Sequence, residues 1–214
     1  MRYDPTSTIK PSNQVEALHA RHSEEPGAVI PHAGICEGDA GQPAFLPQSP
    51  STNEMRLILL GNAGAGKSTM AHRLIGRADI PCLSLDEIAW DQGTRRKPLE
   101  ESRTLLRQFI NANEQWVIEG CYSDLIEAAL PYCTELRFLN PGIETCVAHC
   151  NRRPWEPSKF SSTEQQNAML SQLIQWVQEY ETRDDDYGLK RHRQVFDSFS
   201  GPKHEYTSTA SYEG

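Results

Sequence analysis

Short apolar runs alternate with amphipathic stretches over residues 55–205 of the chain. The first run, Met55 to Leu60, ends in a glycine and is typical of a strand buried on both faces of a sheet. Further strands are expected at residues 81–85, 116–118, 135–139 and, more weakly, 194–196. Helices are expected at residues 67–77, 99–113, 123–130, 140–152 and 162–182. This alternation predicts an α/β fold, with a parallel sheet covered by helices on both faces.

The first 54 residues show no such pattern, and their apolar positions follow neither a period of 2 nor one of 3.6. They hold 7 of the 14 prolines, with 3 Lys+Arg against 7 Asp+Glu. A segment of this kind cannot bury enough apolar area to offset the entropy of ordering its backbone. We therefore expect residues 1–54 to be a disordered, proline-rich acidic extension, followed by one folded domain over residues 55–214.

The net charge of the chain argues against nucleic acid as a partner. The chain carries 21 Lys+Arg against 29 Asp+Glu, a net charge of −8, which argues against a broad surface for nucleic acid. No apolar run approaches the roughly 18 residues that a membrane span needs, and no signal peptide opens the chain. We expect a cytoplasmic protein that binds no membrane.

The segment between the first strand and the first helix matches the phosphate-binding pattern G-x-x-x-x-G-K-[ST] in full. Its nine residues are Gly61, Asn62, Ala63, Gly64, Ala65, Gly66, Lys67, Ser68 and Thr69. Glycines let successive backbone N–H groups turn toward phosphate oxygens, and the following helix presents its positive end to the same anion. Lys67 can reach the β- and γ-phosphates, and the Ser68 hydroxyl can bind Mg²⁺. The sequence therefore predicts a nucleotide site.

An enzyme that uses a nucleotide with Mg²⁺ also needs a carboxylate near the metal. Asp86 follows the second expected strand, and Glu119 closes the third. Both side chains should emerge at the carboxyl edge of the sheet, beside the phosphate loop, although solvated loop carboxylates remain the alternative. Asp91 is expected to be a surface residue.

Cysteine usage indicates reduced thiols. The six cysteines form no C-x-x-C pair. Cys146, His149 and Cys150 fall within one helical turn and could suggest zinc, but no second pair stands at the spacing of a structural site.

Three segments together resemble small P-loop kinases of the adenylate kinase and shikimate kinase type, and are closest to the branch of DNA-topology-modulation-like proteins. They are Met55–Thr69, Leu85-Asp86-Glu87-Ile88-Ala89-Trp90, and Trp116-Val117-Ile118-Glu119-Gly120-Cys121-Tyr122-Ser123. The resemblance spans about residues 55–205. It implies a P-loop three-layer sandwich, with Asp86 contacting the acceptor or acting as base, and Glu119 near Mg²⁺ and the acceptor.

The resemblance also implies a short lid that closes over the phosphates. Arg152 and Arg153 match its position, with solvated helix-end charges as the alternative. Three further arginines, Arg183, Arg191 and Arg193, are possible phosphate contacts, with solvated side chains as the alternative. Trp90 lines either the acceptor pocket or the core. The chain departs from adenylate kinases in two places, since Ala63 replaces a loop proline and Cys121-Tyr122-Ser123-Asp124 stands where an arginine is usual.

The sequence thus favours transfer of the γ-phosphoryl group of ATP·Mg²⁺ to a small-molecule acceptor, with Lys67, Asp86, Arg152 and Arg153 as catalytic residues. A nucleotide-dependent switch or scaffold ATPase is the first alternative, and a nucleic-acid-associated ATPase the second. The sequence names neither the acceptor nor a protein partner for residues 1–54.

Overall fold

The protein is described here by a computed structural model that covers residues 55–76, 80–91, 95–153 and 162–213. The predictions for residues 1–54, and for the part of the lid beyond Arg153, lie outside these described residues.

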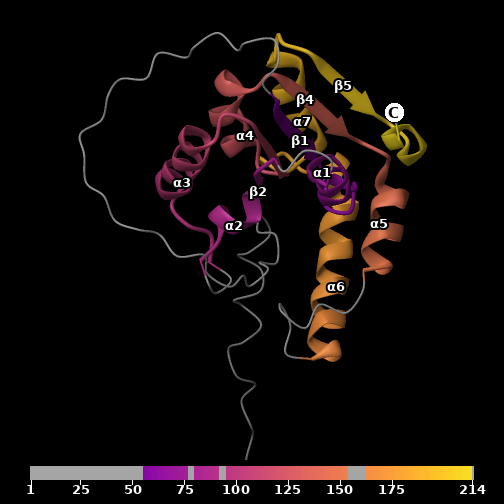
Figure 1. The fold of residues 1–214 in the computed structure, drawn as a ribbon. Helices are drawn as coiled ribbons and strands as arrows, with labels where there is room; N and C mark the ends of the chain where they lie inside the picture. Colours follow the sequence, from indigo (N-terminus) through magenta and orange to yellow (C-terminus); the bar gives the residue numbers. More distant parts are fainter. Residues whose placement is uncertain (1–54, 77–79, 92–94, 154–161, 214) are drawn as a thin grey trace, which may run out of the picture.

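A five-stranded sheet forms the centre of the molecule, with strand order β2-β3-β1-β4-β5 (Figure 1). The strands are β1 (Arg56–Gly61), β2 (Cys82–Ser84), β3 (Trp116–Gly120), β4 (Glu135–Leu139) and β5 (Lys203–Tyr206). Every pairing in the sheet is parallel. All five carboxyl ends therefore lie at one edge, which brings together loops that are far apart in the sequence.

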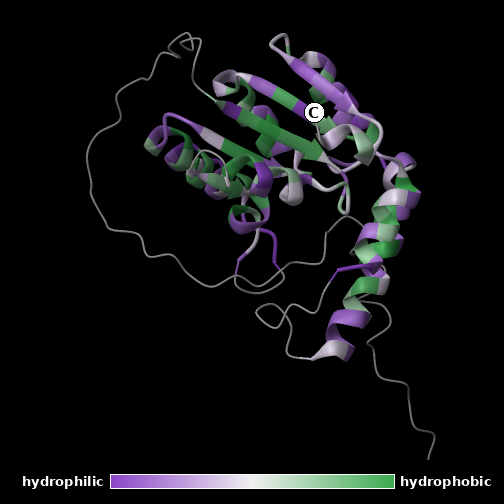
Figure 2. Cartoon of the chain, turned by 45° about the vertical axis from the view of Figure 1, so that its right-hand side comes forward, coloured by the Kyte–Doolittle hydropathy of each residue, from purple (hydrophilic) through white to green (hydrophobic). Residues whose placement is uncertain are grey.

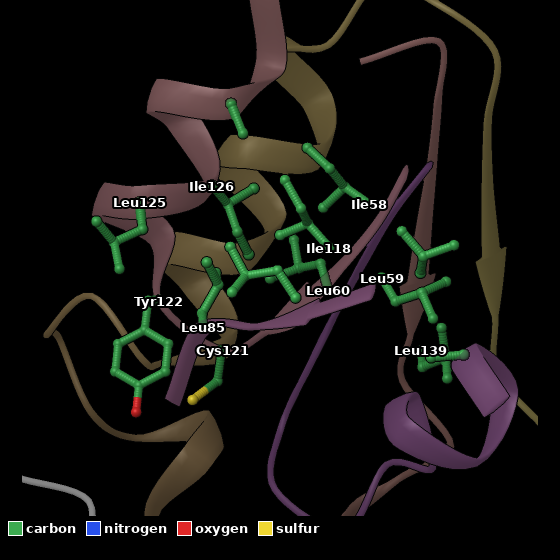
Figure 3. Close-up of a cluster of buried hydrophobic side chains, with 14 of the residues drawn as sticks. Ile58, Leu59, Leu60, Leu85, Ile118, Cys121, Tyr122, Leu125, Ile126 and Leu139 are labelled. Carbon is green, nitrogen blue, oxygen red and sulfur yellow. The ribbon is translucent and has the colours of Figure 1, made fainter. Parts of the chain in front are cut away.

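Helices cover both faces of this sheet. They are α1 (Lys67–Ile75), α2 (Leu85–Ala89), α3 (Leu99–Ala112), α4 (Ser123–Ala129), α5 (Ile143–Asn151), α6 (Thr163–Gln178) and α7 (Leu189–Ser198), with 3-10 turns η1 (Leu130–Tyr132), η2 (Glu179–Glu181) and η3 (Thr209–Glu213). Helix α4 packs against α3 and α7 on one face, and α1 lies on the other (Figure 3). The predicted three-layer α/β architecture is confirmed.

The core is built on the two central strands. Residues 57–60 of β1 and 116–118 of β3 are fully buried, as expected for strands that helices cover on both faces. Leu125 and Ile126 of α4 belong to the same buried cluster as Ile58 and Ile118 of the sheet, and Figure 3 shows Ile126 between Leu125 and Ile118. Figure 2 shows the same division by hydropathy, with apolar central strands and a polar β5 at the edge.

The expected strand at residues 194–196 is wrong, because these residues belong to helix α7. Leu189, His192 and Val195 recur every three residues along α7, and the last two are buried. This helical period outweighs the strand preference of Val195 and Phe196. The true last strand, β5, has no apolar run because it is a half-exposed edge strand that pairs with β4 alone. The short helix α2, directly after β2, was not expected.

Candidate active site

The phosphate-loop sequence forms a tight turn between β1 and α1, as its glycines predict. Gly66 caps α1 with φ 94°, a left-handed conformation that favours glycine. Lys67 is the first residue of the helix and only 9% exposed. Its Nζ donates to the carbonyl of Asn62, 3.0 Å away, so the ammonium group lies across the mouth of its own loop.

Asn62 ties the loop to the rest of the protein. It is 1% exposed, and its Nδ2 donates to the carbonyl of Val177 at the end of α6, 3.2 Å away. Its Oδ1 accepts from the N–H of Ala63 at 2.8 Å. The sequence pattern treats position 62 as variable and therefore gives no hint of this tie.

Ser68 and Glu119 meet beside the loop. The Ser68 hydroxyl donates to Glu119 Oε1 at 3.0 Å. The strand register explains the meeting, because Glu119 of β3 pairs with Leu59 of β1 on one side and Ser84 of β2 on the other. The carboxylate thus lies on the strand next to the loop, at the edge where the sequence expected it.

Asp86 lies in the first turn of α2, two residues beyond β2, and is half-buried. Its Oδ1 accepts a 2.6 Å hydrogen bond from the Tyr122 hydroxyl. That hydroxyl in turn accepts from Nε1 of Trp90 at 2.7 Å. Trp90 is 4% exposed, so it is a core residue whose polar edge faces the site. Figure 3 shows the Tyr122 ring extending from the end of β3, with its oxygen away from the apolar cluster.

Arg96 covers the other side of Tyr122. Its guanidinium carbon lies 4.7 Å from the centre of the Tyr122 ring, and its Nη2 pairs with Asp124 Oδ2 at 3.1 Å. Its Nη1 also donates to the carbonyl of Ala89 at 3.3 Å. Sequence reasoning missed Tyr122, Arg96 and Asp124. The sequence pointed to Tyr122 and Asp124 only as part of a segment that departs from adenylate kinases, where an arginine is usual. It gave no indication of a role for Arg96.

Three carboxylates give this edge a negative potential. Partial burial of the carboxyl group raises the pKa of Glu87, and the charges of Glu119 and Asp86 raise it further, although more than a third of the residue is exposed. Such a potential favours a cation close to Glu119.

The donor set fits Mg²⁺ held jointly with a nucleotide. Among the described residues, no three His, Cys, Asp or Glu side chains are grouped so that they could hold a metal by themselves. Mg²⁺ usually takes one or two protein oxygens together with phosphate oxygens and waters. The hydroxyl of Ser68 and the carboxylate of Glu119, hydrogen-bonded to each other, offer that kind of pair.

The structure does not bring Arg152 and Arg153 into contact with the loop. Both lie at the exposed C-terminal end of α5, where their backbone N–H groups bond to carbonyls of the last turn. Neither guanidinium group has a hydrogen-bond or ion-pair partner among the described residues. Arg191 pairs with Glu127, and Arg193 binds Glu205 through two nitrogens. These last two guanidinium groups have carboxylate partners within the fold.

Arg183 differs from the other arginines because it is buried. Its side chain is 6% exposed, and its guanidinium carbon lies 4.1 Å from the centre of the Trp176 ring. Long ion pairs of 3.5–3.6 Å join it to Asp185 and Glu179. The Arg183 guanidinium therefore contacts an aromatic ring and two carboxylates within the fold.

The three residues considered for zinc have other contacts. Cys146 and Cys150 are buried in the core, and both pack against Gly64 of the phosphate loop. Nδ1 of His149 lies 2.7 Å from the carbonyl of Gly64. The cluster thus supports the loop from outside.

No protein-family profile and no curated protein sequence matches the chain. Solved structures are similar to it, among them the following two. A deoxyadenosine kinase from M. mycoides with bound dATP shares 10% identity at a TM-score of 0.43, with 71% of this chain and 90% of that chain covered. A shikimate kinase from Bacteroides thetaiotaomicron shares 16% identity at a TM-score of 0.40, with coverage of 67% and 97%. The resemblance to the DNA-topology-modulation-like branch stays a prediction.

The strand order, the parallel sheet and the loop between β1 and α1 thus define an α/β protein with a three-layer P-loop architecture. Within the described residues, none of the helices combines the length and the apolar character required to cross a membrane.

Proposed function

We propose that this protein is an ATP-dependent kinase that transfers the γ-phosphoryl group of ATP·Mg²⁺ to the hydroxyl or phosphate oxygen of a small molecule. One observation carries the proposal. The phosphate loop, Glu119 and Asp86 share one edge of the sheet, and the Ser68–Glu119 hydrogen bond links the loop to the neighbouring strand.

The nucleotide side of the reaction rests on the loop. Backbone N–H groups of residues 61–69 and the positive end of α1 would bind the phosphates, with Lys67 balancing charge on the transferred group. Ser68 and Glu119 would hold Mg²⁺, which when bound neutralises phosphate charge and orients the β- and γ-phosphates.

The acceptor side rests on Asp86. Tyr122 holds Oδ1 of its carboxylate, and among the described residues Oδ2 makes no hydrogen bond. Oδ2 is thus available to accept a proton from an acceptor hydroxyl, or to orient that hydroxyl for attack. Because Trp90 fixes the Tyr122 hydroxyl, the carboxylate is held in one orientation before the acceptor binds.

Arg152 and Arg153 enter the proposal as lid residues. Their position at the exposed end of α5 supports this role, since neither guanidinium has a partner among the described residues and either could move onto the phosphates. A closed lid would exclude water and thereby suppress hydrolysis of ATP.

The test is an ADP-release assay with purified full-length protein, ATP·Mg²⁺ and a panel of nucleosides, nucleotides, cyclic polyols and sugars. Acceptor-stimulated ADP release, with a matching phosphorylated product seen by mass spectrometry, is the expected result. ATP consumption that no acceptor stimulates would contradict the kinase and point to a switch or scaffold ATPase. Stimulation by DNA alone would favour the nucleic-acid-associated alternative.

A further inference from the structure

The outer side of the phosphate loop is held by two side chains from late in the sequence. Nδ1 of His149, on α5, lies 2.7 Å from the carbonyl oxygen of Gly64. The Tyr212 hydroxyl, on η3, donates to the carbonyl of Ala65 at 2.8 Å. Because a carbonyl only accepts, His149 must carry a proton on Nδ1. Two successive carbonyls of the loop therefore have donors from outside it.

Helix α5, which carries His149, and the Tyr212 ring also pack directly onto the loop's glycines. A Cβ atom at Gly64 would collide with the backbone of Cys146 and the Cys150 sulfur, both one turn or less from His149 on α5. A Cβ at Gly66 would lie 3.1 Å from the Tyr212 ring. That ring is braced edge-on by Tyr206, the last residue of β5, at a centroid distance of 5.6 Å. Figure 1 shows η3 beside the end of β5.

These contacts matter because this part of the loop has little intrinsic preference for one shape. Gly64 and Gly66 have φ 78° and 94°, and glycine adopts positive and negative φ with similar ease. The peptide units between them can therefore rotate unless their carbonyls are held. Each trans peptide has its N–H opposite its C=O. Holding the Ala65 carbonyl on Tyr212 thus directs the N–H of Gly66 the other way, toward the inside of the turn.

We propose that His149 and Tyr212 are positioning residues that fix the phosphate loop in its anion-binding shape. The inference rests on the proposed nucleotide binding and adds two residues outside the loop motif that set its affinity. Burial raises the pKa of Tyr212, so its hydroxyl keeps its proton and remains a donor at neutral pH. The ligand class is an oligophosphate, with or without a base attached.

Full-length variants test the two donors separately. Tyr212→Phe removes one hydroxyl and keeps the ring. His149→Leu removes the second donor, and His149→Asn restores an N–H close to the position of Nδ1. Tyr132→Phe, on η1 and outside the site, is the matched control. Calorimetry measures Kd for two probes, ADP and inorganic tripolyphosphate, and thermal unfolding is followed in parallel.

Loss of one hydrogen bond to the loop should raise Kd roughly threefold to tenfold, for both probes alike, in Tyr212→Phe and His149→Leu. His149→Asn and Tyr132→Phe should bind as the wild type does. Wild-type affinity in Tyr212→Phe would overturn the inference. A loss confined to ADP would also overturn it, since that indicates contact with the base. Failure of His149→Asn to rescue binding would reduce His149 to a structural role and contradict the proposal.

The same measurements separate this inference from the kinase proposal. If the wild type binds both probes and Tyr212→Phe binds them more weakly, the positioning role is supported. If in addition no acceptor in the panel stimulates ADP release, the kinase proposal is contradicted. A wild-type protein that binds neither probe overturns both.

Discussion

The Tyr122 hydroxyl joins two groups that the sequence could only place separately. It donates to Asp86 and accepts from Trp90, with both distances below 2.8 Å. A hydroxyl so placed fixes the direction of the carboxylate it binds. Tyr122 is therefore a positioning residue for Asp86 in the proposed reaction.

Tyr122→Phe should lower kcat roughly tenfold, because Asp86 loses the donor that orients it. It should also lower the free energy of unfolding by about 1–3 kcal/mol, since the buried Nε1 of Trp90 loses its acceptor. Steady-state kinetics and urea unfolding measure the two effects. Trp90→Phe is the matched variant, because it removes the donor to Tyr122 and keeps the Tyr122–Asp86 bond. An equal kcat loss in both variants would argue that packing, rather than the bond to Asp86, carries the effect.

Lys67→Ala should abolish phosphoryl transfer, by at least roughly a hundredfold, because no other loop side chain supplies a positive charge to the transferred group. The fold should persist, since Nζ donates to the Asn62 carbonyl within the loop itself, at the loop's mouth. Circular dichroism and the acceptor assay check the two parts. Turnover retained in Lys67→Ala would rule out the proposed mechanism.

Helix α7 is attached to the rest of the fold through His192, which is fully buried. Its Nε2 lies 2.8 Å from the carbonyl of Cys121, directly before Tyr122, and its Nδ1 lies 2.7 Å from the Tyr180 hydroxyl on η2. Neutral histidine satisfies both contacts when Nε2 donates and Nδ1 accepts. One imidazole thus connects α7, η2 and the segment that carries Tyr122.

The pKa of His192 is lowered from its usual 6.5 to about 3, chiefly by burial. The hydrogen bond that Nε2 donates to the Cys121 carbonyl raises the pKa, and the charges of Lys67 and Arg183 lower it. Between these two values the unfolded chain binds a proton that the folded protein excludes. Titration of His192 therefore leaves the free energy of unfolding unchanged above pH 6.5. It lowers that free energy as the pH drops toward 3, by up to about 1.4 kcal/mol per pH unit.

Urea unfolding of the wild type between pH 7 and pH 4 should show this loss. His192→Gln should be less stable at pH 7 and show a flatter pH dependence, because it carries no group that titrates there. His72→Gln, on the exposed side of α1, is the control and should keep the wild-type slope. Parallel curves for the wild type and His192→Gln would show that His192 does not cause the acid sensitivity.

At the scale of the whole molecule, the core formed by the described residues begins with strand β1. Strand β1 begins at Arg56, and the buried apolar cluster among the described residues starts at Leu57. The elements that form the candidate site all follow this point in the chain.

A fragment of residues 55–214 should therefore bind ADP with the affinity of the full chain, within about threefold, since the loop and its supports are all included. Its unfolding midpoint should also stay close to that of the full chain. Calorimetry and thermal unfolding on both proteins provide the comparison. A fragment that folds but loses ADP affinity would assign residues 1–54 a part in the site.

Much of the fold could be predicted because the evidence for it is local. The apolar run of β1 and the glycines after it predict a buried strand that ends in a tight glycine turn, and the structure has both. Residues 135–139 form a strand with the expected bounds. Prediction failed for β5, because its sequence contains no apolar run. This strand is held in the sheet by pairing with β4.

The sequence by itself determined the α/β class, the phosphate loop and the two acids at strand ends, since each depends on residue type and spacing along a few turns of chain. Only the tertiary structure decided that Tyr122 holds Asp86, and that His149 and Tyr212 hold the loop. These contacts join residues 36, 85 and 147 positions apart. The physical reason is that a hydrogen bond depends on distance and direction in space, and those become defined only when the parallel sheet brings its carboxyl ends to one edge.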